Sequence, residues 1–109
     1  MDNSRLDQLL NFYAKDDSDP FIIFAIAKEY ERQENLPKAL EYYTMLKRDH
    51  ADYSGTYFHL AQLYADLEDT ENALEVYNTG IQIAEKQGDI HALSELKNAK
   101  LNFELENGL

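Results

Sequence analysis

The residues of this sequence best suited to acid–base or metal chemistry are three histidines, His50, His59 and His91. Imidazole titrates near neutral pH and is a common metal ligand. The three are scattered, and no two have the spacing of a metal-binding or catalytic motif. The run His50-Ala51-Asp52 is explained by a helix end followed by the next cap, because a cationic imidazole is favoured near terminal carbonyl groups. We therefore expect surface histidines without a catalytic or metal-binding role.

Other catalytic signals are missing from the sequence. It has no Gly-rich phosphate loop, no HExxH or GxSxG motif, four glycines, and no cysteine to act as nucleophile, zinc ligand or disulfide partner. Acidic side chains alternate with basic ones in a pattern typical of solvated helical faces, without a DxDxDG calcium loop. These acidic residues are Glu29, Glu31, Glu34, Glu41, Glu71 and Glu75. We predict no enzymatic activity, no cofactor and no metal ion.

Composition and charge narrow the class of partner. The 109 residues are 44% hydrophobic, as in a folded protein of one domain, and 21 acidic against 10 basic residues leave a net charge of -11. Such a surface repels nucleic acid and anionic membranes, so basic or amphipathic protein segments are the expected partners. The N-terminus lacks the pattern of a signal peptide, and the longest apolar run, residues 21–27, is too short to cross a bilayer. We expect a cytoplasmic protein.

An internal repeat organises the chain. The segments ENLPKALEYY (34–43) and EDTENALEVY (68–77) match at an offset of 34 residues, as do Ala27 to Tyr30 and Ala61 to Tyr64. Within each unit the apolar residues follow two helical stripes, which predicts stacked helical hairpins. The first stripe is Ile23, Ile26, Ala27 and Tyr30, matched by Tyr57, Leu60, Ala61 and Tyr64; the second is Ala39, Leu40, Tyr43 and Leu46, matched by Ala73, Leu74, Tyr77 and Ile81.

Helix boundary signals fall between these stripes. Asp19-Pro20 predicts a helix start, and Gly88-Asp89 predicts a C-cap followed by an N-cap. Asn35 and Asp69 occupy equivalent cap positions, and Ser54 or Asp52 can begin the helix between them. An N-terminal stripe from Leu6 to Tyr13 and a last segment over 89–107 add two helices. The total is six helices with no strand signal.

The period and the residue types together resemble the tetratricopeptide repeat over residues 20–87. Three features depart from that family's pattern: Ile23 stands where Trp is usual, Glu34 and Glu68 stand in turns where Gly is common, and the usual Pro after the second helix is absent. The resemblance implies an all-α fold, a right-handed superhelical stack of about six antiparallel helices in three hairpins. Its expected layout is one domain, 1–109, with a half repeat (1–18), two repeats (20–53 and 54–87) and a capping helix (88–109).

The resemblance also implies a site, because in this family the first helices of the repeats line a concave groove that holds peptides or proteins. The residues expected there are Phe21, Phe24, Lys28, Glu31, Arg32, Phe58, Gln62 and Asp66. Phe24 and Phe58 would be apolar anchors, and the alternative is their burial against the terminal helices. Capture of a chaperone's C-terminal tail is not expected, because only Lys28 matches the basic residues which that task requires.

The last helix carries two apolar stripes. Ala92, Leu96, Ala99 and Phe103 are spaced to pack on the preceding helices, while Ile90, Leu93, Leu101 and Leu105 lie on the opposite side. A terminal helix should be polar on its outer side, so the second stripe suggests self-association as a homodimer. The alternative is partial exposure of a frayed C-terminus. The two functions under consideration are thus a peptide-binding module and a homo-oligomeric structural element.

Overall fold

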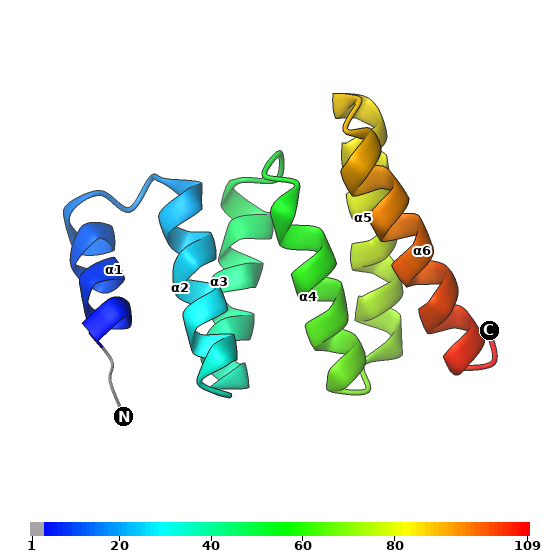
Figure 1. The fold of residues 1–109 in the computed structure, drawn as a ribbon, viewed down its shortest axis with the longest axis horizontal. Coiled ribbons are helices and arrows are strands. Elements are labelled where there is room, and N and C mark those ends of the chain that lie inside the picture. The colour runs from blue at the N-terminus through cyan, green and yellow to red at the C-terminus, as the bar shows by residue number, and fades with distance from the viewer. Residues whose placement is uncertain (1–3) are drawn as a thin grey trace. The chain divides into compact units, whose positions relative to one another are not determined.

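The computed structural model describes residues 4–109, which form six α-helices and contain no strand (Figure 1). Residues 1–3 of the expected N-terminal half repeat lie outside the described range. The predicted all-α class and the number of helices are confirmed for this range. The helices are α1 (Ser4–Lys15), α2 (Pro20–Arg32), α3 (Leu36–Asp49), α4 (Gly55–Asp66), α5 (Thr70–Gln87) and α6 (Ile90–Glu106).

Consecutive helices pack together within two compact units. The first unit ends at Tyr53 and holds α1, α2 and α3; the second begins at Ser54 and holds α4, α5 and α6. In the first, α2 packs on α1 and on α3. In the second, α5 packs on α4 and on α6, and α6 also contacts α4. The hairpins α2–α3 and α4–α5 are the two copies of the repeat (Figure 1).

Local capping explains where the helices begin. The carboxylate of Asp19 accepts a hydrogen bond from the backbone N–H of Phe21 at 2.9 Å, with Pro20 as first helical residue. Three other predicted caps also accept from the first turns, which satisfies backbone donors that the helix itself cannot. They are Asn35 on α3, Asp69 on α5 and Asp89 on α6. Ser54 precedes α4 but makes no side-chain capping hydrogen bond.

Two of the turns adopt a left-handed backbone at a glutamate. Glu34 after α2 has φ 60°, and Glu68 after α4 has φ 61°. The next residue's N–H then bonds back into the helix, from Asn35 to Tyr30 O and from Asp69 to Tyr64 O, both at 2.9 Å. This conformation costs a non-glycine residue about 1 kcal/mol. It explains why glycine is common at this point of the repeat.

The core follows most of the predicted stripes, with half-buried residues at Tyr30, Leu40, Tyr64 and Leu74. Ile23, Ile26, Ala27, Ala39 and Tyr43 are buried in the first unit, and so are their counterparts Tyr57, Leu60, Ala61, Ala73 and Tyr77 in the second. The predicted match of Leu46 to Ile81 is wrong. At the offset of 34 residues the counterpart of Leu46 is Gly80, which is buried, while Ile81 is half-buried.

Gly80 is buried because two side chains occupy the space beside it. A Cβ at this position would lie 2.5 Å from Cβ of Tyr57 and 3.2 Å from Cδ1 of Leu96. In the first unit the corresponding pair is Ile23 and Leu46. The large ring of Tyr57 on α4 therefore fits because Gly80 on α5 has no side chain. The two changes together conserve the side-chain volume between the helices.

Glu29 was expected on a solvated face, and this expectation is wrong. Its side chain is only 7% exposed and accepts hydrogen bonds from the guanidinium of Arg32 at 2.6 and 3.1 Å. Nε of Arg5 on α1 lies 3.2 Å from the same carboxylate. The hydrogen bonds from Arg32 hold the pKa of Glu29 below its ordinary value. The pattern of alternating charges missed this site because α1 covers this part of α2.

Candidate functional site

In the first unit, the expected groove residues differ in exposure. Phe21 is 58% exposed, and Lys28 and Arg32 are also exposed, whereas Phe24 and Glu31 are half-buried. Arg32 is engaged by Glu29. These five residues lie along α2.

Phe24 belongs to an aromatic cluster within its own unit. Its ring centroid lies 6.2 Å from that of Tyr43 on α3 and 5.5 Å from that of Tyr53. The ammonium of Lys28 lies 5.6 Å from the Phe24 ring, within range of a cation–π contact. Much of the ring is thus covered by neighbours from α3 and the segment after it, and not by a terminal helix as the burial alternative had it.

The hydroxyl of Tyr43 is satisfied from α2. Tyr43 is fully buried and donates a hydrogen bond to Oε1 of Glu31 at 2.8 Å. Burial, together with this hydrogen bond and the charge of Glu31, raises the pKa of Tyr43, which stays neutral. The hydroxyl of Tyr43 is therefore satisfied within its own hairpin.

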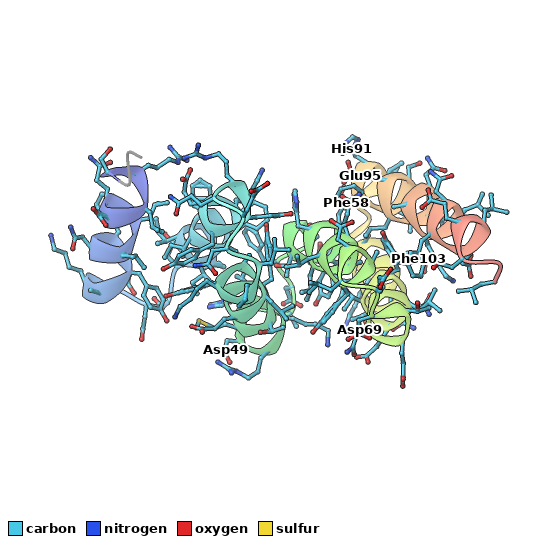
Figure 2. All side chains as sticks on the ribbon, turned by 90° about the horizontal axis from the view of Figure 1, so that it is seen from below. Asp49, Phe58, Asp69, His91, Glu95 and Phe103 are labelled. Atoms are coloured by element: carbon cyan, nitrogen blue, oxygen red, sulfur yellow. The ribbon has the colours of Figure 1, made fainter. Side chains whose placement is uncertain are left out.

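The second unit has an open cleft at the corresponding place. The cleft has a volume of about 430 Å³ and lies between the α4 and α6 sides of the unit, with α5 beneath. Phe58 and Glu95, both labelled in Figure 2, are among its lining residues. We call it the α4–α6 cleft. Its lining residues are Phe58, Gln62, Ala65, Asp66, Tyr77, Glu95, Asn98, Ala99, Asn102, Phe103 and Glu106.

Three of the expected groove residues thus share one cleft, namely Phe58, Gln62 and Asp66. Phe58 is half-buried and its ring lies edge-on to His59 at 5.6 Å. The contribution of α6 was missed, because this helix was expected only to cap the repeats. A signal was present in the sequence, since Glu95, Asn98, Asn102 and Glu106 follow helical spacing between the two apolar stripes.

Tyr77 lines the cleft from α5 and is 3% exposed. Its ring centroid lies 5.9 Å from that of Phe103, yet its hydroxyl forms no hydrogen bond with any residue in the range 4–109. The reason lies in the repeat, because the counterpart of Glu31 is Ala65. Burial, and then the carboxylates of Asp66 and Glu106, raise the pKa of Tyr77.

The charge of the α4–α6 cleft is negative. Asp66, Glu95 and Glu106 line it, none of them forms an ion pair within the described part of the chain, and no basic residue shares the lining. Gln62, Asn98 and Asn102 add amide donors and acceptors. The arrangement combines carboxylates, amides and aromatic rings, which suits recognition of a polar or cationic group.

The outer side of α6 leaves apolar residues exposed. Ile90 is 78% exposed, Leu101 54% and Leu105 69%, while Leu93 is half-buried. The other stripe of this helix is buried at Leu96 and Phe103. The predicted division of α6 into a packed and an unpacked apolar side therefore corresponds to the observed burial of these residues.

No group of three or more His, Cys, Asp or Glu side chains in the range 4–109 converges as metal ligands would. No helix in the range has the length and hydropathy needed to span a membrane. His50 ends α3 as its C-cap, as expected, and His91 is exposed near the start of α6 (Figure 2).

Repeated two-helix units with this period and these packed positions define a helical-repeat protein. The model of the tetratricopeptide repeat matches residues 54–87. The crystal structure of a tetratricopeptide repeat domain protein from Salinibacter ruber is 41% identical, with a TM-score of 0.76, covering 79% of this chain and 96% of that one. A solution NMR structure of such a protein from the same organism gives the same identity and TM-score, covering 79% and 87%.

The chain belongs to the tetratricopeptide repeat family. A comparison with curated proteins gave no match. Domains of this family generally mediate protein–protein interactions, so the partners to consider are proteins. The resemblance inferred from the repeat is confirmed.

Proposed function

We propose that this protein is a non-enzymatic interaction module that binds a peptide or protein segment on the faces of α2 and α4 carrying the expected groove residues. The observation that carries the proposal is the α4–α6 cleft, which brings Phe58, Gln62 and Asp66 together in an open space of about 430 Å³. Half-buried aromatic rings bordered by polar groups are typical of anchoring positions in protein interfaces.

The two faces would contribute differently. On α4 the cleft offers depth, whereas on α2 the exposed Phe21 and Lys28 offer a flatter surface beside the covered Phe24. Phe58 is therefore the stronger candidate for an anchor, and Phe21 and Lys28 are the candidate contact residues on α2.

The test begins with peptides selected from a random display library against the full chain. Each selected peptide is then titrated by fluorescence polarisation against the parent and against Phe58→Ala. Loss of an anchoring ring should weaken binding at least about tenfold, or about 1.4 kcal/mol. Leu101→Ala, on the outer side of α6, is the matched control and should bind as the parent does. If the selected peptides bind Phe58→Ala as tightly as the parent, the proposal is wrong.

A second candidate function is self-association through the outer side of α6. The exposure of Ile90, Leu101 and Leu105 favours it, since three large apolar side chains on one helix face are typical of an interface. Sedimentation equilibrium over a wide concentration range tests it. A dimer that dissociates in Leu101→Glu would support self-association, whereas a monomer at every concentration would remove it.

A further inference from the structure

We propose that the α4–α6 cleft receives an arginine side chain of the bound protein segment, held between Asp66 and Glu106 against the hydroxyl of Tyr77. This inference rests on the proposed function and names the chemistry of its partner.

Tyr43 and Tyr77 occupy the same place in the repeat, 34 residues apart, and both are buried. Tyr43 donates its hydroxyl proton to Glu31 at 2.8 Å. The hydroxyl of Tyr77 has no such acceptor among residues 4–109, because Ala65 replaces the glutamate. Within residues 4–109, Thr56 Oγ1 is the one side-chain polar atom that is both buried and without a hydrogen bond, so the hydroxyl of Tyr77 is accessible from the cleft. Its oxygen can accept a hydrogen bond from a ligand.

The missing side chain also leaves space. Ala65 lines the cleft at the position from which Glu31 reaches Tyr43 in the other repeat. The ligand group that fills this space must satisfy Tyr77 and tolerate the carboxylates beside it. A positively charged hydrogen-bond donor meets both requirements, because the Tyr77 oxygen can accept from it while the carboxylates attract its charge.

Charge selects a cation. Asp66 on α4 and Glu106 on α6 act on Tyr77 from two different helices, and Glu95 lines the same cleft. None of the three carboxylates has a basic partner within the described range. A carboxylate or phosphate ligand would be repelled, whereas a cation gains from all three. The net charge of -11 would also attract a basic segment from a distance.

Geometry favours guanidinium over ammonium. A guanidinium carries five N–H donors in one plane, so it can donate to Asp66, to Glu106 and to the Tyr77 oxygen together. Its flat face can also stack on an aromatic ring such as that of Phe58. Gln62, Asn98 and Asn102 would then be available for the backbone on either side of the arginine.

The experiment uses the full chain and a small probe, Nα-acetyl-argininamide, followed by amide chemical shifts in NMR. Its neutral isostere, Nα-acetyl-citrullinamide, is the control ligand. We expect the arginine probe to shift resonances of the α4 and α6 cleft residues with a dissociation constant in the millimolar range, as its size allows. The citrulline probe should bind at least about tenfold more weakly. Equal binding of the two probes, or shifts outside the cleft, would overturn the inference.

Substitutions in the cleft test separately the charge of its carboxylates, the hydroxyl of Tyr77 and the space beside Ala65. Asp66→Asn/Glu106→Gln should weaken the arginine probe at least about tenfold, whereas Glu71→Gln/Glu85→Gln, which removes the same charge elsewhere in the unit, should change binding less than about twofold. Parent-like binding to the first pair would contradict the proposal.

Two further variants address Tyr77 and Ala65. Tyr77→Phe should unfold at the same urea concentration as the parent, since its hydroxyl has no hydrogen bond to lose, and should bind the arginine probe more weakly. Ala65→Gln should fill the cleft without adding charge, give Tyr77 an acceptor and abolish binding. If Ala65→Gln is folded and binds as the parent does, the cleft is not the site.

The outcome is separable from that of the proposed function. Library peptides that depend on Phe58 but carry no basic residue would overturn this inference and leave the proposed function intact. Peptides that bind without dependence on Phe58 would remove both.

Discussion

The hairpins α2–α3 and α4–α5 share the side-chain caps of their second helices, their left-handed turns and most of their core, and they differ in how a buried tyrosine is satisfied. In α2–α3 the tyrosine hydroxyl donates to a glutamate of its own hairpin. In α4–α5 an alanine stands there instead, and a cleft of about 430 Å³ adjoins the tyrosine. The same pairing of helices therefore accommodates both a tyrosine that is hydrogen-bonded within its hairpin and a tyrosine that adjoins an open cleft.

The largest effect is expected at Gly80, where the hairpins also differ because α3 has Leu46 at the equivalent position. The added methyl group of Gly80→Ala would lie 2.5 Å from Cβ of Tyr57, so α4 and α5 must separate. We expect a loss of about 3 kcal/mol in the free energy of unfolding, measured by urea denaturation.

A second variant tests whether the ring of Tyr57 contributes to the cost of Gly80→Ala. Tyr57→Ile places the residue of α2 at this position, although the close contact is with Cβ, which isoleucine retains. Loss of the ring should ease the shift of α4, so Gly80→Ala should cost at least about 1 kcal/mol less in this background. Equal costs in both backgrounds would mean that Gly80 and the Tyr57 ring are not coupled.

The next prediction concerns the hydrogen bond between Tyr43 and Glu31 in the α2–α3 hairpin. Glu31→Ala removes the acceptor that Glu31 supplies to the buried Tyr43 and should destabilise the protein by about 2 kcal/mol. Thermal and urea unfolding measure the effect. In a Tyr43→Phe background the same change should cost about 1 kcal/mol or less, because no hydroxyl is then deprived of its acceptor. An undiminished cost in that background would assign the effect to Glu31 alone.

A smaller effect depends on pH and concerns Glu29, whose counterpart in α4 is the buried Leu63. Because the pKa of Glu29 is lowered in the folded state, its carboxylate stabilises the fold above the ordinary value of 4.5, and this contribution is lost as pH falls through the folded pKa. Glu29→Gln should therefore be less stable than the parent near neutral pH by about 1 kcal/mol, since both arginines are largely exposed.

The difference between parent and Glu29→Gln should narrow as pH falls below 4.5. Urea unfolding of both proteins along a pH series measures it, and comparing the two cancels the titration of the other carboxylates. A gap that stays constant down to the acid limit would contradict a charge-based contribution.

The smallest effect is expected at the left-handed turns that both hairpins contain. Glu34→Gly and Glu68→Gly should each stabilise the protein by about 0.5–1 kcal/mol, because glycine adopts the left-handed backbone without steric cost. The two gains should add, since the turns lie in different hairpins. Glu71→Gly, within the first turn of α5, is the control and should destabilise instead.

Features that depend on near neighbours in the chain could be predicted from the sequence. The caps at Asp19, Asn35 and Asp69 and the stripes around Ala27 and Ala61 act within one helix or one hairpin, so their signals are local. The burial of Glu29 could not be predicted in this way, because it depends on Arg5 from another helix.

The candidate site was predictable in part for the same reason. Phe58, Gln62 and Asp66 follow from the helical phase of α4, which the repeat defines. The share of α6 depends on how that helix crosses α4, and the unsatisfied Tyr77 emerges only when its hydroxyl is compared with that of Tyr43. The replacement of Glu31 by Ala65 is visible in the repeat, but its consequence for Tyr77 follows only once the hydrogen bond from Tyr43 to Glu31 is known.

The packing of consecutive helices also bears on how quickly the protein acquires its structure. Nearly all helix–helix contacts within each unit join neighbours along the chain, connected by short turns such as those at Glu34 and Glu68. Little loop entropy must be lost before such contacts form, so the relative contact order is low and folding within milliseconds or faster is expected. Nucleation can begin in either hairpin, which gives the chain two parallel routes to the native state.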